Sequence, residues 1–207
     1  MTEVAGDFYD YIVIDNDHFG FLVADVSGHG VPAALIASMV KAAMHSAIDF
    51  ADNPRKVMKH LAQVIGSQLQ GQFITAAYLF IDLTTGKACY SAAGHPPVFY
   101  WNRSNPKLET IQSNGLLISA LMQDEYPAIE LNLKKGDRFL LYTDGLTEAE
   151  NKNGEQFGDR KLQEVLKANK NIPLEELSSV LNNTLKIWIA DPGQQQDDFT
   201  WVIIDVL

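Results

Sequence analysis

Short runs of apolar residues, separated by polar turns, recur along much of the chain. Runs of this length bounded by Asp, Asn, Gly and Thr are typical of β-strands joined by tight turns. Asp15-Asn16-Asp17 separates the first two runs and Thr84-Thr85-Gly86 another pair, so both pairs predict antiparallel hairpins. The predicted strands are Phe8–Ile14, His18–Val26, Phe73–Leu83, Lys87–Ala93, Val98–Trp101, Leu108–Ile111, Leu116–Leu121, Ala128–Leu133, Arg138–Thr143 and Phe199–Val206.

Four longer segments have apolar residues at helical spacing. Pro32 lies in the first turn of one of them, where proline is tolerated, and Asp52-Asn53-Pro54 starts the next. The predicted helices are Gly30–Phe50, Pro54–Gln70, Gly158–Ala168 and Leu174–Ile189. Because helices come in two pairs with hairpins between them, the pattern predicts an α+β fold. Two mainly antiparallel sheets, each with a helix pair outside it, form the most economical packing.

Composition narrows the classes of function. The 207 residues have a formal net charge of −10, which argues against nucleic-acid backbones and anionic membranes as partners. The longest apolar segment, Val31–Ile48, contains Lys41 and His45 and predicts a buried helix, not a membrane span. Cys89 is the single cysteine, so neither an internal disulfide nor a thiolate zinc site can form. We expect a cytoplasmic protein.

The stretch Ala24–Gly30 has the sequence of a strand end followed by a glycine-rich turn and a helix. Asp25 would be costly at the end of a buried strand unless something neutralised its charge. Gly28 and Gly30 allow a sharp turn and the close approach of a ligand. A tight loop with a capping Asp explains the stretch equally well when it is taken alone.

Further acidic residues stand at other strand boundaries. Asp7 or Asp10, at the open end of the first hairpin, would lie near Asp25, and Asp144 and Asp197 stand beside two later strands. Gathered carboxylates repel one another unless a cation lies among them, and they select hard ions such as magnesium or manganese. Two such ions can activate water for phosphoester hydrolysis.

Together, the motifs at these positions resemble the metal-dependent (PPM, or type 2C) serine/threonine phosphatases, in particular their bacterial SpoIIE/RsbU-like branch. The resemblance covers nearly the whole chain. The motifs that carry it are Gly6-Asp7-Phe8-Tyr9-Asp10, Asp25-Val26-Ser27-Gly28-His29-Gly30, Ala93-Gly94-His95-Pro96-Pro97, Leu141-Tyr142-Thr143-Asp144-Gly145-Leu146-Thr147-Glu148-Ala149, Gly154-Glu155-Gln156-Phe157-Gly158 and Asp197-Asp198-Phe199-Thr200.

The resemblance implies a four-layer αββα sandwich with two Mn2+ or Mg2+ ions between the sheets. By position, Asp25 would bridge the ions and the Val26 carbonyl would bind one of them. Asp144 and Asp197 would bind the second ion, and Asp7 would bind an ion directly or through water. These four aspartates are the implied catalytic residues.

Other residues of the motifs have weaker implied roles. Glu148 and Asp198 are candidates for a third metal or for supporting contacts, and Asp10 is expected to be a structural hydrogen-bonding residue. Gly28, His29 and Gly30 are candidates for contact with the phosphate or the leaving group, and His29 could equally be loop filler. We expect His95 to fix a turn through backbone hydrogen bonds.

The implied activity is hydrolysis of phosphoserine or phosphothreonine on a regulatory partner, by attack of a metal-bridging hydroxide. In this branch the partner is typically a STAS-type anti-sigma factor antagonist. Residues 1–207 would form one phosphatase domain, the C-terminal part of a longer protein with an upstream receiver or sensor domain. The sequence leaves open whether the protein forms a homodimer. The alternative is an adaptor that binds a signalling partner without catalysis; retention of the four aspartates argues against it.

Overall fold

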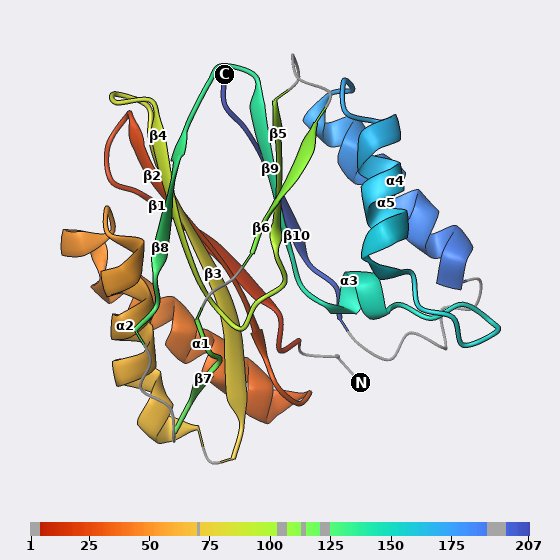
Figure 1. The fold of residues 1–207 in the computed structure, drawn as a ribbon. Coiled ribbons are helices and arrows are strands. Elements are labelled where there is room, and N and C mark those ends of the chain that lie inside the picture. Colours follow the sequence, from red (N-terminus) through yellow and green to blue (C-terminus); the bar gives the residue numbers. More distant parts are fainter. Residues whose placement is uncertain (1–4, 70, 103–106, 113–114, 121–124, 190–197) are drawn as a thin grey trace. The chain divides into compact units, whose positions relative to one another are not determined.

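The computed structural model describes residues 5–69, 71–102, 107–112, 115–120, 125–189 and 198–207. The chain forms two compact units, coloured along the sequence in Figure 1. Unit 1 comprises Met1–Pro96 and Gln112–Leu133, and unit 2 comprises Pro97–Ile111 and Lys134–Leu207. Each unit contains one sheet and its own helices.

The sheet of unit 1 has six strands in the order β1-β2-β3-β4-β8, with β7 also pairing with β3. All of these pairs are antiparallel, and the two predicted hairpins are β1–β2 and β3–β4. The strands are β1 (Phe8–Val13), β2 (His18–Val26), β3 (Phe73–Asp82), β4 (Lys87–Ala93), β7 (Ile118–Ser119) and β8 (Ala128–Asn132).

Two helices cover one face of this sheet, α1 (Val31–Ser46) and α2 (Pro54–Ile65), as Figure 1 shows. Short 3-10 turns, Ile48–Phe50 and Gly66–Gln68, follow them. The Asn53 side chain accepts a hydrogen bond from the Lys56 amide at 3.1 Å, so an N-cap sets the start of α2. Small residues of α1, such as Ala33 and Ala43, are buried against Leu22 and Ala76 of the sheet.

The sheet of unit 2 has four antiparallel strands in the order β10-β9-β5-β6. They are β5 (Val98–Asn102), β6 (Leu108–Ile111), β9 (Asp137–Tyr142) and β10 (Trp201–Asp205). The helices of the unit are α3 (Gly145–Glu148), α4 (Gly158–Ala168) and α5 (Leu174–Ile189). Leu162 of α4 and Leu181 of α5 pack with Phe99 and Leu140 of the sheet in one core.

The α+β class with two antiparallel sheets and a helix pair on each is therefore confirmed. The four-layer stack remains a prediction, as does the extent of the phosphatase domain. Two details differ from the sequence-based expectation. The helix α3 was not predicted, and the strand expected at Leu116–Leu121 contains only β7 among the described residues.

No helix within the described part of the chain is long and apolar enough to span a membrane.

Candidate metal centre

The first hairpin places three of the predicted ligands at one end of unit 1. Phe8 pairs with Ala24, so Asp7 and Asp25 lie across from each other at the next position, and both are partly exposed. A Cβ atom on Gly6 would lie 2.7 Å from the Val26 carbonyl oxygen. Only glycine allows this close approach, which brings the backbone beside Asp7 against the Val26 carbonyl. Two carboxylates and a carbonyl at one place form an oxygen-rich donor set that fits a hard divalent ion.

The turn after Val26 is fixed by contacts that sequence reasoning did not identify. The Ser27 amide donates to the Phe73 carbonyl at 3.0 Å, and the Phe73 amide donates to Ser27 Oγ at 2.8 Å. Gln72 Nε2 donates to the Ser27 carbonyl at 2.9 Å. Ser27 and Gln72 therefore attach the turn to the start of β3. Their only sequence signal was the apolar strand that begins at Phe73.

Glycine is required where this turn enters α1. Gly28 has a φ of +94° and Gly30 a φ of +75°, and side chains other than glycine rarely adopt these values. His29 between them is exposed. The turn thus presents backbone and the His29 ring at the same end of unit 1 as Asp25. Contact of these three residues with a phosphate remains a prediction.

Asp10 lies away from Asp7 and Asp25, because it pairs with Leu22 further along the hairpin. Its carboxylate accepts hydrogen bonds from Lys41 Nζ at 2.7 Å and His45 Nε2 at 2.8 Å, both on α1. Burial raises the pKa of Asp10, but these hydrogen bonds outweigh burial and hold the pKa below its usual value. Of the two residues expected near Asp25, the structure favours Asp7, and Asp10 fastens β1 to α1.

His95 contacts the residue that pairs with Asp25 across the sheet. It is buried, and its Nδ1 lies 2.8 Å from the hydroxyl of Thr75, which is the β3 partner of Asp25. The expectation of backbone hydrogen bonds for His95 therefore missed its side-chain partner. No sequence spacing links the two residues, because 20 positions separate them and only the β3–β4 hairpin brings them together.

Unit 2 places Asp144 where β9 ends and α3 begins. The Thr143 amide donates to the Thr200 carbonyl at 3.0 Å, and the Thr200 amide donates to Thr143 Oγ1 at 2.9 Å. This exchange of hydrogen bonds continues the β9–β10 pairing, so Asp144 and Asp198 stand at the same end of the sheet. The side chain of Asp144 does not cap α3. The backbone carbonyl of Asp144 accepts hydrogen bonds from the Thr147 and Glu148 amides, each at 2.8 Å.

The remaining candidates are Glu148, Asp198 and Asp197. Glu148 is exposed at the last position of α3, one helical turn after Asp144, and Asp198 is also exposed. Asp197 lies outside the described residues. Within the part of the chain that the structure describes, no three acidic, histidine or cysteine side chains are grouped as a metal site. The joint binding of ions by Asp7, Asp25, Asp144 and Asp197 is therefore a proposal.

The other histidines have structural partners. His18 Nδ1 lies 2.7 Å from Asp15 Oδ1, and its Nε2 lies 3.3 Å from Asp82. His60 Nε2 lies 2.7 Å from Ser46 Oγ. These contacts account for both rings without a role in chemistry.

Known proteins give an independent view of the fold and of these motifs. The family model described as Stage II sporulation protein E (SpoIIE) matches residues 15–207. The chain is 30% identical over 205 residues to the phosphoserine phosphatase RsbU of Bacillus subtilis, covering 98% of this chain and 59% of that protein. It therefore spans little more than half the length of this relative.

Two solved structures share the fold. The SiaA-PP2C domain of Pseudomonas aeruginosa matches with a TM-score of 0.87 and 26% identity, over 98% of this chain and 81% of that one. RsbX in complex with magnesium matches with a TM-score of 0.68 and 16% identity, over 97% and 86%. The fold and the motifs thus define a PP2C-type phosphatase domain. Within that class, the chain belongs to the SpoIIE family.

Proposed function

We propose that this chain is a metal-dependent protein serine/threonine phosphatase. The observation that carries the proposal is the end of the first hairpin, where Asp7, Asp25 and the Val26 carbonyl stand together and glycine at position 6 permits their approach. The name of RsbU, a phosphoserine phosphatase, supports the same activity.

We propose that Asp7, Asp25, Val26, Asp144 and Asp197 hold two divalent ions, Mn2+ or Mg2+. Carboxylate and carbonyl oxygens are the donors that these ions prefer, and magnesium is the ion named for the related RsbX structure. When bound, such ions neutralise charge on a phosphoryl group and lower the pKa of water.

The chain's own residues would do the remaining work. The aspartates would fix the positions of the ions: Asp7 and Asp25 lie at one end of the β1–β2 pairing, and Asp144 follows the end of β9. Gly28 and Gly30 keep the adjacent turn open to a phosphorylated side chain. His29, exposed in that turn, would supply a proton to the departing serine oxygen.

We further propose that the substrate is a phosphorylated STAS-type anti-sigma factor antagonist and that the reaction takes place in the cytoplasm. Support comes from RsbU and from the SpoIIE family model. Control by an upstream receiver or sensor domain, and homodimer formation, belong to the same proposal.

Hydrolysis of p-nitrophenyl phosphate and of a phosphoserine peptide, with Mn2+ added, tests the activity. We expect Asp25→Asn and Asp144→Asn each to lower kcat/KM at least about 100-fold, since each removes charge at an ion. Asp49→Asn and Glu175→Gln change exposed carboxyl groups outside the motifs and should leave the rate unchanged. Equal rates in wild type and in both motif variants would refute the proposed phosphatase activity. Retained binding of the partner would then favour the alternative, an adaptor without catalysis.

A further inference from the structure

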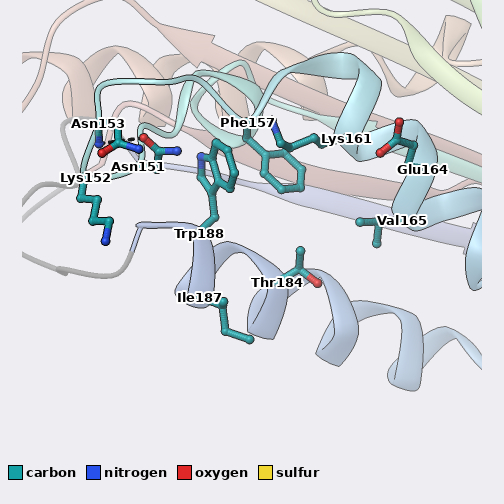
Figure 2. Close-up of a pocket in the computed structure, with 10 residues that line it drawn as sticks. All are labelled: Asn151, Lys152, Asn153, Phe157, Lys161, Glu164, Val165, Thr184, Ile187 and Trp188. Atoms are coloured by element: carbon teal, nitrogen blue, oxygen red, sulfur yellow. Dashed lines mark hydrogen bonds between the residues drawn. The ribbon is translucent and has the colours of Figure 1, made fainter.

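Unit 2 contains a groove that none of the proposed metal ligands lines. It has a volume of about 540 Å3 and lies between α4, α5 and the loop at residues 151–153. Figure 2 shows side chains of the two helices and of this loop around it. This size lies within the range of sites that bind small molecules or peptide side chains.

The wall of the groove is rich in apolar groups. Trp188 of α5 is partly buried and meets the buried Phe157 ring edge-on, with 5.8 Å between the centroids. Ile187, next to it, is 80% exposed, although it lines the groove. Covering such an isoleucine and the open part of a tryptophan would be favourable, and aromatic anchors of this kind dominate many protein interfaces.

The charge at the groove is opposite to that of the whole chain. Lys152 and Lys161 line it, and Lys161 Nζ lies 4.1 Å from the centroid of the Trp188 ring. Glu164 is the one carboxylate among the described lining residues, and Arg160 donates to it at 3.0 Å, which offsets its charge. On a chain of net charge −10, this local balance favours an acidic occupant.

The two aromatic residues of the groove are tied to the segment that begins at Asp144. The Ala149 carbonyl accepts hydrogen bonds from the Phe157 amide at 2.9 Å and from Trp188 Nε1 at 3.0 Å. Ala149 directly follows α3, and its amide donates to the Gly145 carbonyl at 3.1 Å. An occupant that orders Trp188 would therefore also stabilise the segment from Gly145 to Ala149.

We propose that this groove docks a segment of a partner protein that carries a bulky apolar side chain next to carboxylates. The apolar side chain covers Ile187 and Trp188, and the carboxylates lie beside Lys152 and Lys161. The inference does not depend on the phosphatase activity, because it concerns binding alone.

A random-peptide library displayed on phage, selected on the intact chain, tests the proposal. We expect the enriched peptides to share a Leu, Ile, Phe or Trp within a few positions of Asp or Glu. Fluorescence anisotropy then gives the affinity of a labelled enriched peptide for wild type and variants. Lys161→Glu and Ile187→Asp should each weaken binding at least about 10-fold, which corresponds to about 1.4 kcal/mol.

Two matched variants serve as controls. Lys167→Glu reverses an exposed lysine of the same helix outside the groove, and Leu207→Asp changes an apolar residue that is 91% exposed. Both should bind the peptide as wild type does. Failure to enrich acidic and apolar peptides, equal affinity for all the variants, or equal binding of a peptide with lysine in place of its acidic residues would each overturn the proposal. Circular dichroism of each variant confirms the fold.

Discussion

At the scale of single residues, the candidate centre depends on a few contacts that support the aspartates. Gly6 permits the close approach to the Val26 carbonyl, and Ser27 attaches the following turn to β3. Thr75 pairs with Asp25 across the sheet and is itself held by His95. We expect these contacts to act on the aspartates through the position of the backbone.

The pair of Thr75 and His95 gives a prediction about metal affinity. Thr75→Val keeps the shape of the side chain but leaves the buried His95 nitrogen without its hydroxyl partner, a loss of about 1–3 kcal/mol. We expect the strand end at Asp25 to shift and Mn2+ to bind about 10-fold more weakly in a calorimetric titration.

Thr75→Ser is the matched control, because it retains the hydroxyl group and should restore most of the affinity. If the two variants bind Mn2+ equally well, the Thr75–His95 contact does not position Asp25. Measuring kcat at saturating Mn2+ separates weak metal binding from a fault in the chemistry.

At the scale of elements, strand pairing sets which residues meet, and one buried ion pair crosses β9 and β10. Arg138 and Asp205 are direct partners in the register, with side chains 0% and 13% exposed. Arg138 Nη2 donates to Asp205 Oδ2 at 2.6 Å, and Nη1 donates to the Ile172 carbonyl at 3.0 Å. The pair connects the sheet of unit 2 to the loop before α5.

Removal of either member of the Arg138–Asp205 pair should therefore lower the stability of the fold. Asp205→Ala leaves a buried guanidinium unpaired, and we expect the free energy of unfolding to fall by about 3–5 kcal/mol in urea titrations. Glu164→Ala breaks the exposed pair with Arg160 and should cost less than about 1 kcal/mol. Similar losses in the two variants would contradict the account of the buried pair.

Two turns of unit 1 are joined by His18. The hydrogen bond to Asp15 raises the pKa of His18 above its usual value of 6.5. The pKa of Asp15 is lowered, first by the Asp17 amide and then by His18. Hydrogen bonds from Thr85 lower the pKa of Asp82, with a smaller effect of His18.

The sign of the pH dependence follows from these shifts. Because the pKa of His18 is higher in the folded protein than in the unfolded protein, protonated His18 stabilises the fold at pH values below the unfolded pKa. This contribution is lost as the pH rises through the folded pKa. The lowered carboxyl pKa values give stability that is lost only at acid pH. We expect His18→Gln to lower Tm at about pH 6 and to have little effect at about pH 9.

His60→Gln is the control for this measurement, because the His60 ring contacts the neutral Ser46 hydroxyl. A His18→Gln effect of the same size at both pH values would show that packing on Phe80, and not charge, gives His18 its role.

At the scale of the whole molecule, most elements could be predicted from the sequence, since apolar runs and turn residues mark them directly. The helix α3 could not, because its four residues are too few to show a helical period. The hairpin pattern alone left Asp7 and Asp10 as alternatives and the family resemblance favoured Asp7; the register agrees, because it pairs Asp10 with Leu22. The contacts of Ser27 and His95 and the groove beside Trp188 arise from residues far apart in the chain, and a single sequence does not show which of these residues meet.

We propose that Asp25 and Asp144 contribute to one centre that holds two ions. Titration of the intact chain with Mn2+, followed by electron paramagnetic resonance, tests it most directly. We predict two bound Mn2+ per chain with a spin-coupled spectrum, lost in Asp25→Asn and in Asp144→Asn and retained in Asp49→Asn. A spectrum of isolated Mn2+ that only one of the two motif variants changes, or no binding at all, would contradict the account.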